Sequence, residues 1–412
     1  MGLKVPPIEQ LKVAIIGLGN RGSLHAQLIA SLYPKARVTA LCDIREAKVT
    51  PSATLLKETG QAPAVYTGTP EAWREMVRRD DIDLVLIATP WELHAPMSIY
   101  AMQQGKHVAT EVPAALTLED CWKLVDTAEA TQRNCMMLEN TCYGDEELWI
   151  LNMVKAGIFG TLTYAEAAYI HNLAESMFTD KYYHHWRLRH HLVSDANLYP
   201  THGLGPVAQY LGIGRGDRFE HMVAMSSIQA SLTEHARALE QSHEFYGRSD
   251  FAHGDMNNAL IKTHQGRTIL LQHDVVTPRP YSRINALAGT HAYHEGYPSR
   301  LSVKGKNEHE WLSEAAYQEM RETFKHPIWD DLKEEIAKDN SHGGMDFVMT
   351  YRMVDNFNRG QALDMDVYDA VDWSVSTPLS ATSIQLGSIP VKFPDFTRGH
   401  WQEKRVLEIL KS

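Results

Sequence analysis

The sequence has few cysteines and no long apolar run, and each shortage excludes a class of protein. Only four cysteines occur among the 412 residues (Cys42, Cys121, Cys135 and Cys142), and no two of them form a Cys-x-x-Cys pair. This spacing suits neither a disulfide framework nor a zinc cluster. No apolar stretch approaches the roughly 18 residues that a membrane helix needs, so we expect no membrane partner.

Basic residues are also in deficit, because 40 Lys and Arg stand against 51 Asp and Glu, which gives a formal net charge of −11. Such a charge disfavours nucleic acid as a partner, since the phosphate backbone attracts basic proteins. Residues 1–10 contain no apolar segment typical of a secretion signal. The compartment stays open, because a chain from which a signal had been removed would read the same way.

A hydrophobic content of 44% with 22% charged residues is typical of a globular protein, and 412 residues predict more than one domain. Short apolar strands alternate with helical segments as far as residue 140, which predicts a parallel sheet covered on both faces. Later strand-like runs, such as 162–170 and 268–275, are longer and more alternating, which favours an antiparallel sheet with one covered face. We place the domain boundary near residue 142 and expect residues 368–385 to pack back on the first domain.

The first predicted strand, residues 11–16, runs into a glycine-rich turn. The turn reads Gly17-Leu18-Gly19-Asn20-Arg21-Gly22, a G-x-G-x-x-G pattern between a strand and a helix. In that setting the glycines let backbone N–H groups approach a pyrophosphate at the helix N-terminus. Asp43 follows the second predicted strand, where a carboxylate binds the ribose hydroxyls and repels a 2′-phosphate. The pattern therefore predicts NAD in preference to NADP, a preference that the nearby Arg45 weakens slightly.

Polar or aromatic residues follow three further strands of the predicted sheet. Residues 89–94 (TPWELH), 111–113 (EVP) and 139–140 (EN) each come directly after an apolar run. Ligands of open α/β sheets bind at the carboxyl ends of the strands. We therefore expect these strand ends to form one continuous crevice.

With these motifs the chain resembles the glucose–fructose oxidoreductase/inositol dehydrogenase family. The resemblance implies an α/β fold with an N-terminal NAD-binding Rossmann domain (residues 1–142) and a C-terminal substrate-binding α/β domain (residues 143–412) on an open, mostly antiparallel sheet. The family usually has Glu-Lys-Pro where this chain has Glu111-Val112-Pro113, so the lysine at the sugar hydroxyl is missing. It also usually has an Asp four residues before a His, whereas Leu198 stands four residues before His202 here. Both departures argue against an ordinary sugar dehydrogenase.

Where the chain departs from the family's usual motifs, its residues are similar to those of one branch, the NAD-dependent α-N-acetylgalactosaminidases of glycoside hydrolase family 109. The matching segments are residues 139–144 (ENTCYG), 182–183 (YY), 186–187 (WR), 197–206 (NLYPTHGLGP), 279–283 (RPYSR) and 342–347 (HGGMDF). Several separated matches in one order are more specific than the glycine turn alone. The resemblance covers essentially the whole chain.

The resemblance assigns residues of this chain to two sites. The cofactor site comprises the glycine turn and the positions that match the family's NAD contacts: Gly17, Gly19, Asn20, Arg21, Gly22, Asp43, Trp91, His94, Glu111, Val112 and Asn140. The positions that match its sugar contacts are Tyr169, Arg187, Tyr199, Pro200, Thr201, His202 and Tyr281. We expect no metal, because adjacent histidines such as His184 and His185 point in different directions and no HExxH motif occurs.

The resemblance also implies a reaction. NAD⁺ oxidises the sugar at C3, the C2 hydrogen is removed, the leaving group departs from C1, water adds, and the hydride returns with the anomeric configuration retained. His202 is a suitable base because an imidazole titrates near neutral pH. Tyr199, three residues earlier, can relay a proton or hold an alkoxide by hydrogen bonding. We predict that His202 and Tyr199 carry the proton transfer, with their division of labour open.

Two other functions stay open on the same residues. A net NAD-dependent sugar or inositol dehydrogenase is the alternative, and Val112 in place of the lysine argues against it. A non-catalytic sugar-sensing protein is the third, and the joint presence of Asp43, Tyr199 and His202 argues against it. The resemblance further implies a small-molecule or terminal glycan substrate and a homo-oligomer. The sequence leaves the exact sugar, linkage and aglycone open.

Overall fold

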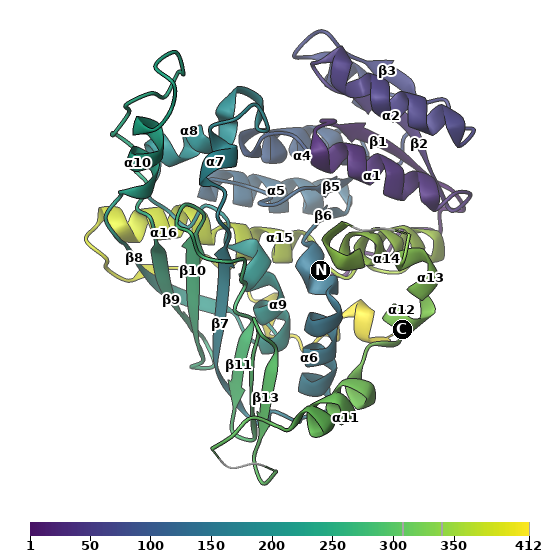
Figure 1. Cartoon of the computed structure of the whole chain (residues 1–412). Helices are drawn as coiled ribbons and strands as arrows, with labels where there is room; N and C mark the ends of the chain where they lie inside the picture. The colour runs from purple at the N-terminus through teal and green to yellow at the C-terminus, as the bar shows by residue number, and fades with distance from the viewer. Residues whose placement is uncertain (307–308, 339–340, 412) are drawn as a thin grey trace. The chain divides into compact units, whose positions relative to one another are not determined.

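A computed structural model of the chain describes residues 1–306, 309–338 and 341–411 (Figure 1). The contacts divide the chain into two compact units. The first comprises residues 1–144, 327–374 and 405–412, and the second comprises residues 145–326 and 375–404. The domain limits that the sequence suggests, 1–142 and 143–412, remain a prediction.

The first unit contains a six-stranded sheet in the order β3-β2-β1-β4-β5-β6. All neighbouring strands in it are parallel. Its strands are β1 (Leu11–Ile16), β2 (Ala36–Cys42), β3 (Ala64–Tyr66), β4 (Leu84–Ile87), β5 (His107–Thr110) and β6 (Cys135–Met137). Between them lie α1 (Asn20–Ser31), α2 (Glu46–Glu58), α3 (Ala72–Val77), η1 (Trp91–Leu93), α4 (His94–Gln103) and α5 (Leu118–Thr131). The strand order reverses between β1 and β4, and open α/β sheets bind their ligands at such a switch point.

The central strands form because they are short, apolar and buried on both faces. All four residues of β4 are buried, and so are the last four residues of β1. Helices on both faces of a parallel sheet require this pattern. The same rule explains why the alternation of apolar strands and helices in the sequence predicted the sheet.

Later segments of the chain also belong to the first unit: α12 (Pro327–Asp331), α13 (Lys333–Ile336), η4 (Ser341–Gly344), α14 (Met345–Arg359) and α15 (Val367–Ser374). Helix α15 packs against α5 and β6, and α14 packs against α1 and η2 (Asn140–Tyr143). A buried polar network joins them to the sheet. Asp364 accepts hydrogen bonds from Arg352 Nη2 at 2.8 Å and from the Tyr143 hydroxyl at 3.2 Å.

The second unit contains an eight-stranded sheet in the order β13-β12-β11-β7-β10-β9-β8-β14. Its strands are β7 (Leu162–Ile170), β8 (Phe219–Ser226), β9 (Asn257–Thr263), β10 (Thr268–Asp274), β11 (Ala286–Gly289), β12 (Ala292–Glu295), β13 (Arg300–Val303) and β14 (Val391–Lys392). Only the pair β7 and β10 is parallel among the neighbours of this described sheet. The predicted fold class, a parallel Rossmann sheet followed by a mostly antiparallel one, is confirmed.

The helices of the second unit are α6 (Asp145–Lys155), α7 (Ala174–Met177), α8 (Trp186–Val193), α9 (Thr201–Leu211), α10 (Ser231–Arg237), α11 (Glu314–Phe324) and α16 (Ser376–Gln385). Helix α9 packs on β7 and α16 packs on β8 (Figure 1). The approach of α9 requires a glycine, because a Cβ at Gly203 would lie 2.4 Å from the Ala168 nitrogen. In the described part of the chain, no helix combines the length and the apolar character needed to cross a membrane.

The polar composition of residues 228–256 predicts a loop or an excursion from the fold, and the structure places helix α10 within this segment. Leu232 and Ala236, one helical turn apart, are fully buried in an apolar cluster with Phe178, Phe245 and Phe251. Phe245 and Phe251 lie in the same segment, but residues far away in the sequence, such as Phe178 and Val275, complete the cluster, so the local composition gave no signal of the helix.

We predict that Asp364→Ala destabilises the first unit by roughly 3–5 kcal/mol, because it leaves the buried guanidinium of Arg352 without its carboxylate. Urea denaturation followed by tryptophan fluorescence measures the change. Asp81→Ala is the control, since it removes a half-exposed pair with Arg79 and is expected to cost less than about 1 kcal/mol. Equal losses in the two variants would contradict the structural role of Asp364.

Candidate cofactor and sugar sites

The glycine turn joins β1 to α1, and its three glycines have different environments. Gly17 has a φ of +85°, and a Cβ there would lie 2.6 Å from the Ala88 carbonyl oxygen. A Cβ at Gly22 would lie 1.7 Å from the Gly17 oxygen. Gly19 has an ordinary φ of −68°, and a Cβ there would meet no atom within 4 Å. The chain's own packing therefore requires Gly17 and Gly22, whereas the open space at Gly19 suits a ligand at the helix N-terminus.

Asp43 lies directly after β2 and is 7% exposed. Its Oδ2 accepts a hydrogen bond from the Leu18 backbone at 2.8 Å, and its Oδ1 accepts one from the Arg45 backbone at 2.9 Å. Each oxygen of an ionised carboxylate has a further acceptor position, so two ribose hydroxyls can bind without displacing these contacts. The turn, α1 and α2 line a cavity of about 410 Å³ beside it.

Arg21, the fifth residue of the turn, connects the turn to the end of β5 and the start of α14. Its Nε donates to Glu111 at 2.6 Å, and its Nη1 and Nη2 each donate to Asp346 at 2.9 Å. His25 Nε2 lies 2.8 Å from the same Glu111 oxygen. Burial by itself raises the pKa of Glu111, but Arg21 and His25 outweigh it and hold that pKa far below its usual value.

Asp346 also contacts Asn140 and His342. It accepts a hydrogen bond from Asn140 Nδ2 at 2.9 Å, and His342 Nδ1 lies 2.6 Å from its other oxygen. Burial alone raises the pKa of Asp346, but His342 and Arg21 lower it well below its usual range. Asp346 is absent from the predicted cofactor set, although it lies in the matching segment 342–347.

Asn140 offers a direct sign of a ligand. Its side chain is buried, and its Oδ1 has no hydrogen-bond partner among the described residues. Leaving a buried amide oxygen unsatisfied costs roughly 1–3 kcal/mol. A donor on a bound molecule, such as a carboxamide or a ribose hydroxyl, would satisfy it. Together with Gly19 and Asp43, this oxygen makes the residues of the first unit fit NAD.

His94 links two of the predicted strand ends. Its Nδ1 lies 2.7 Å from the Pro113 carbonyl oxygen, and its Nε2 lies 2.8 Å from the Thr89 carbonyl oxygen. Burial lowers the pKa of His94, so the ring is neutral and donates to only one of them. Trp91 and Val112 are buried beside these strand ends. The structure thus gives His94 a role in aligning them, and its predicted contact with the cofactor stays a prediction.

In the second unit, Tyr169 lies at the centre of the predicted sugar site. Its ring centroid is 4.6 Å from that of Tyr199 and 5.4 Å from that of His202, and the latter two are 4.8 Å apart. These rings meet because α9 begins at Thr201, directly after Pro200, and packs closely on β7. The two predicted catalytic residues are therefore brought together.

Arg187 lies on α8 beside the same rings. Its guanidinium carbon is 4.8 Å from the centroid of Tyr199, and its Nη1 donates to the Tyr182 hydroxyl at 3.2 Å. The buried Thr201 Oγ1 has no hydrogen-bond partner among the described residues. A guanidinium fork and an unsatisfied hydroxyl suit a ligand rich in hydroxyl and carbonyl groups, such as an amino sugar.

The phenols of this cluster have different acidities. Burial raises the pKa of Tyr169 to about 12, in spite of Arg187. Burial also acts to raise the pKa of Tyr182, but Arg187 outweighs it and the pKa of Tyr182 is lowered. Tyr169 is therefore a hydrogen-bond donor, and Tyr182 is the better base. Tyr182 is absent from the predicted sugar set, although it lies in a matching segment.

Three buried histidines support Arg187 and Tyr169. His191 and His253 have ring centroids 4.5 Å apart, and those of His253 and His273 are 5.3 Å apart. His273 stacks on Tyr169 at 6.4 Å, and His191 Nδ1 lies 2.9 Å from the Arg187 carbonyl oxygen. Burial lowers the pKa of all three histidines. Among the residues that the structure describes, no group of three or more His, Cys, Asp or Glu side chains can hold a metal ion.

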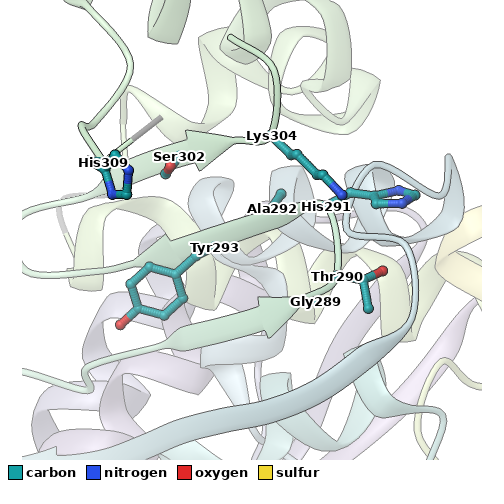
Figure 2. Close-up of a pocket in the computed structure, with 8 residues that line it drawn as sticks. All are labelled: Gly289, Thr290, His291, Ala292, Tyr293, Ser302, Lys304 and His309. Atoms are coloured by element: carbon teal, nitrogen blue, oxygen red, sulfur yellow. The ribbon is translucent and has the colours of Figure 1, made fainter. Parts of the chain in front are cut away.

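A separate depression of about 350 Å³ lies on the strands β11 to β13 (Figure 2). It is lined by Gly289, Thr290, His291, Ala292, Tyr293, Ser302, Lys304 and His309. None of these residues belongs to either predicted site. The depression is therefore distinct from the sugar-site cluster around Tyr169.

The architecture is shared with solved NAD-linked oxidoreductases. One from Klebsiella pneumoniae is 17% identical with a TM-score of 0.73, and the likeness covers 94% of this chain and all of that one. Levoglucosan dehydrogenase in complex with NADH and L-sorbose is 16% identical with a TM-score of 0.72, over 94% of this chain and all of that one. Residues 11–139 match the family model of the oxidoreductase family with an NAD-binding Rossmann fold. The first unit is therefore built on an NAD-binding Rossmann domain.

The rest of the chain narrows the class of protein. Residues 143–403 match the family model "Glycosyl hydrolase 109, C-terminal domain". "Glycosyl hydrolase family 109 protein 1" of Shewanella sp. (strain ANA-3) is 46% identical, over 100% of this chain and 90% of that protein. "Alpha-N-acetylgalactosaminidase" of Shewanella oneidensis is 46% identical over the same shares. The chain belongs to glycosyl hydrolase family 109.

We predict that Asp346→Asn weakens NAD binding at least about tenfold, which corresponds to ~1.4 kcal/mol. The variant keeps the shape of Asp346 but removes the charge that orients Arg21. Isothermal titration with NAD⁺ after the cofactor has been stripped measures the affinity. Asp355→Asn, which changes an acid on the same helix that pairs with Lys35 and Arg359, is the control. An unchanged affinity in Asp346→Asn would contradict the role of the network.

We also predict that acid destabilises the second unit through the buried histidines. Their pKa values are lowered in the folded state, so the unfolded state binds more protons below its pKa of about 6.5. The stabilisation is therefore complete above that pH and is lost as the pH falls. In urea denaturation, the free energy of unfolding is expected to fall less between pH 7 and pH 5 for His273→Gln than for the wild type. His400→Gln, at an exposed histidine, is expected to keep the wild-type slope.

Proposed function

We propose that the chain is a retaining glycosidase that acts on N-acetyl-α-galactosaminides, with NAD as a recycled cofactor. The observation that carries this proposal is the cluster in which Tyr199 and His202 contact Tyr169 and Arg187 contacts Tyr199. The cluster lies within residues 143–403, which match family 109. The cluster supplies proton donors, a base and a cation. Such a cluster suits a substrate that loses a proton from the C3 hydroxyl and then a proton from C2.

Bound NAD would supply the reversible oxidation of the sugar at C3. The residues that would hold it are those of the glycine turn, Asp43 and Asn140, as their geometry suggests. The remaining chemistry belongs to the chain. His202 and Tyr199 hold and move the protons of the C3 hydroxyl and of C2, and the C3 ketone makes the C2 hydrogen acidic enough for a side-chain base.

The choice of sugar rests on one relative and one side chain. The relative from Shewanella oneidensis, 46% identical, carries the name alpha-N-acetylgalactosaminidase. Arg187 presents a planar set of N–H donors that matches an acetamido carbonyl. A net dehydrogenase is disfavoured, because the aliphatic side chain of Val112 cannot take a proton from the hydroxyl being oxidised.

We further propose that the chain forms a homo-oligomer through the uncovered face of the second sheet. Met225 on β8 is 59% exposed and Leu260 on β9 is 50% exposed. Val223, Leu260 and Leu270 form one cross-strand row on adjacent strands. Apolar side chains gathered on an open sheet are typical of an interface between subunits.

We expect the wild type to release phenol from an aryl N-acetyl-α-galactosaminide without added NAD⁺ and without accumulating NADH. In D₂O, NMR is expected to show retention at C1 and deuterium at C2. His202→Ala and Tyr199→Phe are expected to lower kcat at least about 100-fold, since a positioned acid or base contributes about 10²–10⁴. His221→Ala, on β8, is the control for histidine loss.

Three results would overturn the proposal. A stoichiometric rise in NADH absorbance would assign the chain to the dehydrogenases. Near wild-type kcat in both His202→Ala and Tyr199→Phe would refute the roles proposed for these residues. Binding of the sugar without turnover of any glycoside would favour a sensor.

A further inference from the structure

A buried ion pair in the second unit lies outside both predicted sites. Arg283 is 7% exposed and Glu147, on α6, is 3% exposed. Arg283 Nη2 donates to Glu147 Oε1 at 2.5 Å. Burial by itself lowers the pKa of Arg283, but Glu147 outweighs it and keeps that pKa well above its usual value. The guanidinium is therefore a permanent cation held in one place.

The same guanidinium reaches a residue of the predicted sugar site. Arg283 Nη1 donates to the Tyr281 hydroxyl oxygen at 2.7 Å. Because that oxygen accepts a hydrogen bond from a cation, its own proton must point elsewhere. A phenol polarised in this way is also a stronger hydrogen-bond donor than a free one.

The backbone fixes this arrangement. Ser282 pairs with Ile170 at the end of β7 through two hydrogen bonds of 3.0 Å. Tyr281 and Arg283 flank Ser282, so both project from the same face of this extended pair. Ile284 follows with a φ of +61°, which is strained for a β-branched residue. Such strain is retained where a site must be held in one geometry.

Exposure separates Tyr281 from the other aromatic residues. Tyr281 is 40% exposed, whereas Tyr169, whose ring centroid lies 6.3 Å away, is 7% exposed. The aglycone of a glycan is the part that must extend into solvent. An aglycone that extends into solvent would leave the cluster at its exposed edge, which is the edge that Tyr281 forms.

We propose that the pair Glu147–Arg283 positions Tyr281 as the proton donor to the departing glycosidic oxygen. This inference rests on the proposed function. Tyr281 is the catalytic residue in it, and Arg283 and Glu147 are positioning residues that act through it.

Tyr281 loses its proton in the elimination and regains a proton in the addition of water. In the elimination, the electron pair at C2 forms the C1–C2 double bond, the C1–O bond breaks, and the leaving oxygen takes the Tyr281 proton. In the addition, water attacks C1, the C1–C2 π bond breaks and its electron pair returns to C2 for reprotonation there, and the phenolate of Tyr281 takes the proton of the water. Tyr281 is thereby restored, and Arg283 stabilises the phenolate between the two steps.

The test is the dependence of kcat on the leaving group. A dinitrophenolate departs without protonation, whereas phenol and methanol require it. For Arg283→Gln we expect kcat on phenyl N-acetyl-α-galactosaminide to fall about 100-fold, and kcat on the dinitrophenyl glycoside to fall less than about tenfold. Glu147→Gln, which keeps the shape of the carboxylate, is expected to show the same selectivity with a smaller loss.

A second variant keeps the test decisive if the loss of a buried charge prevents folding. Tyr281→Phe leaves the ion pair intact and is expected to show the same selectivity for good leaving groups. Arg300→Gln is the matched control, because Arg300 pairs with Glu295 on neighbouring strands and both rates are expected to stay unchanged. Equal losses on the two glycosides in Tyr281→Phe, or no loss, would overturn the proposal.

Exchange at C2 separates this inference from the proposed function. A wild type that shows neither hydrolysis nor deuterium at C2 would refute the proposed function itself. If the wild type is active, Tyr281→Phe is expected to retain C2 exchange in D₂O, because the donor acts after the C2 proton has left. Loss of exchange together with hydrolysis would place Tyr281 at an earlier step and refute the role proposed here.

Discussion

A buried guanidinium that must keep a carboxylate partner is the constraint on which both units depend. Arg21, Arg283 and Arg352 each lie against a buried acid: Arg21 between Glu111 and Asp346, Arg283 at Glu147, and Arg352 at Asp364. Removing either member of such a pair leaves an unpaired buried charge, which is far costlier than the pair's net contribution. The ion pairs therefore fix the positions of the groups around them.

In the first unit these ion pairs bring together the residues of the predicted cofactor site from distant parts of the chain. Asp364 ties the returning helices to Tyr143, at the end of η2. Asp346 then reaches Arg21 in the glycine turn and Asn140 after β6. The turn, two strand ends and the start of α14 are held in one arrangement. A rigid site of this kind suits a cofactor that stays bound through repeated cycles, since pre-organisation lowers the cost of binding.

In the second unit, different surroundings give three phenol side chains different capacities to donate or accept a proton. Tyr169 has a raised pKa because it is buried, Tyr182 has a lowered one because it faces Arg187, and Tyr281 accepts a hydrogen bond from Arg283. A reaction that moves protons at three positions of one sugar needs donors and bases of different strength. Phenols in contrasting environments provide that range, as a pair of carboxylates does in ordinary glycosidases.

Features that depend on residues close together in the chain could be predicted from the sequence. The strand, the glycine turn and Asp43 follow within about 30 residues, so local pattern was enough to predict the Rossmann sheet and NAD. The meeting of Tyr199 and His202 was also predictable, because both lie at one helix start. Other features depend on contacts between residues that are far apart in the chain. Asp346 lies 325 positions from Arg21. Helix α10 is buried partly by residues from other parts of the chain, such as Phe178 and Val275. Arg283 is paired with Glu147, which lies on α6. These contacts are set by burial and charge pairing across the fold, and no local pattern encodes which distant partner a buried charge will find.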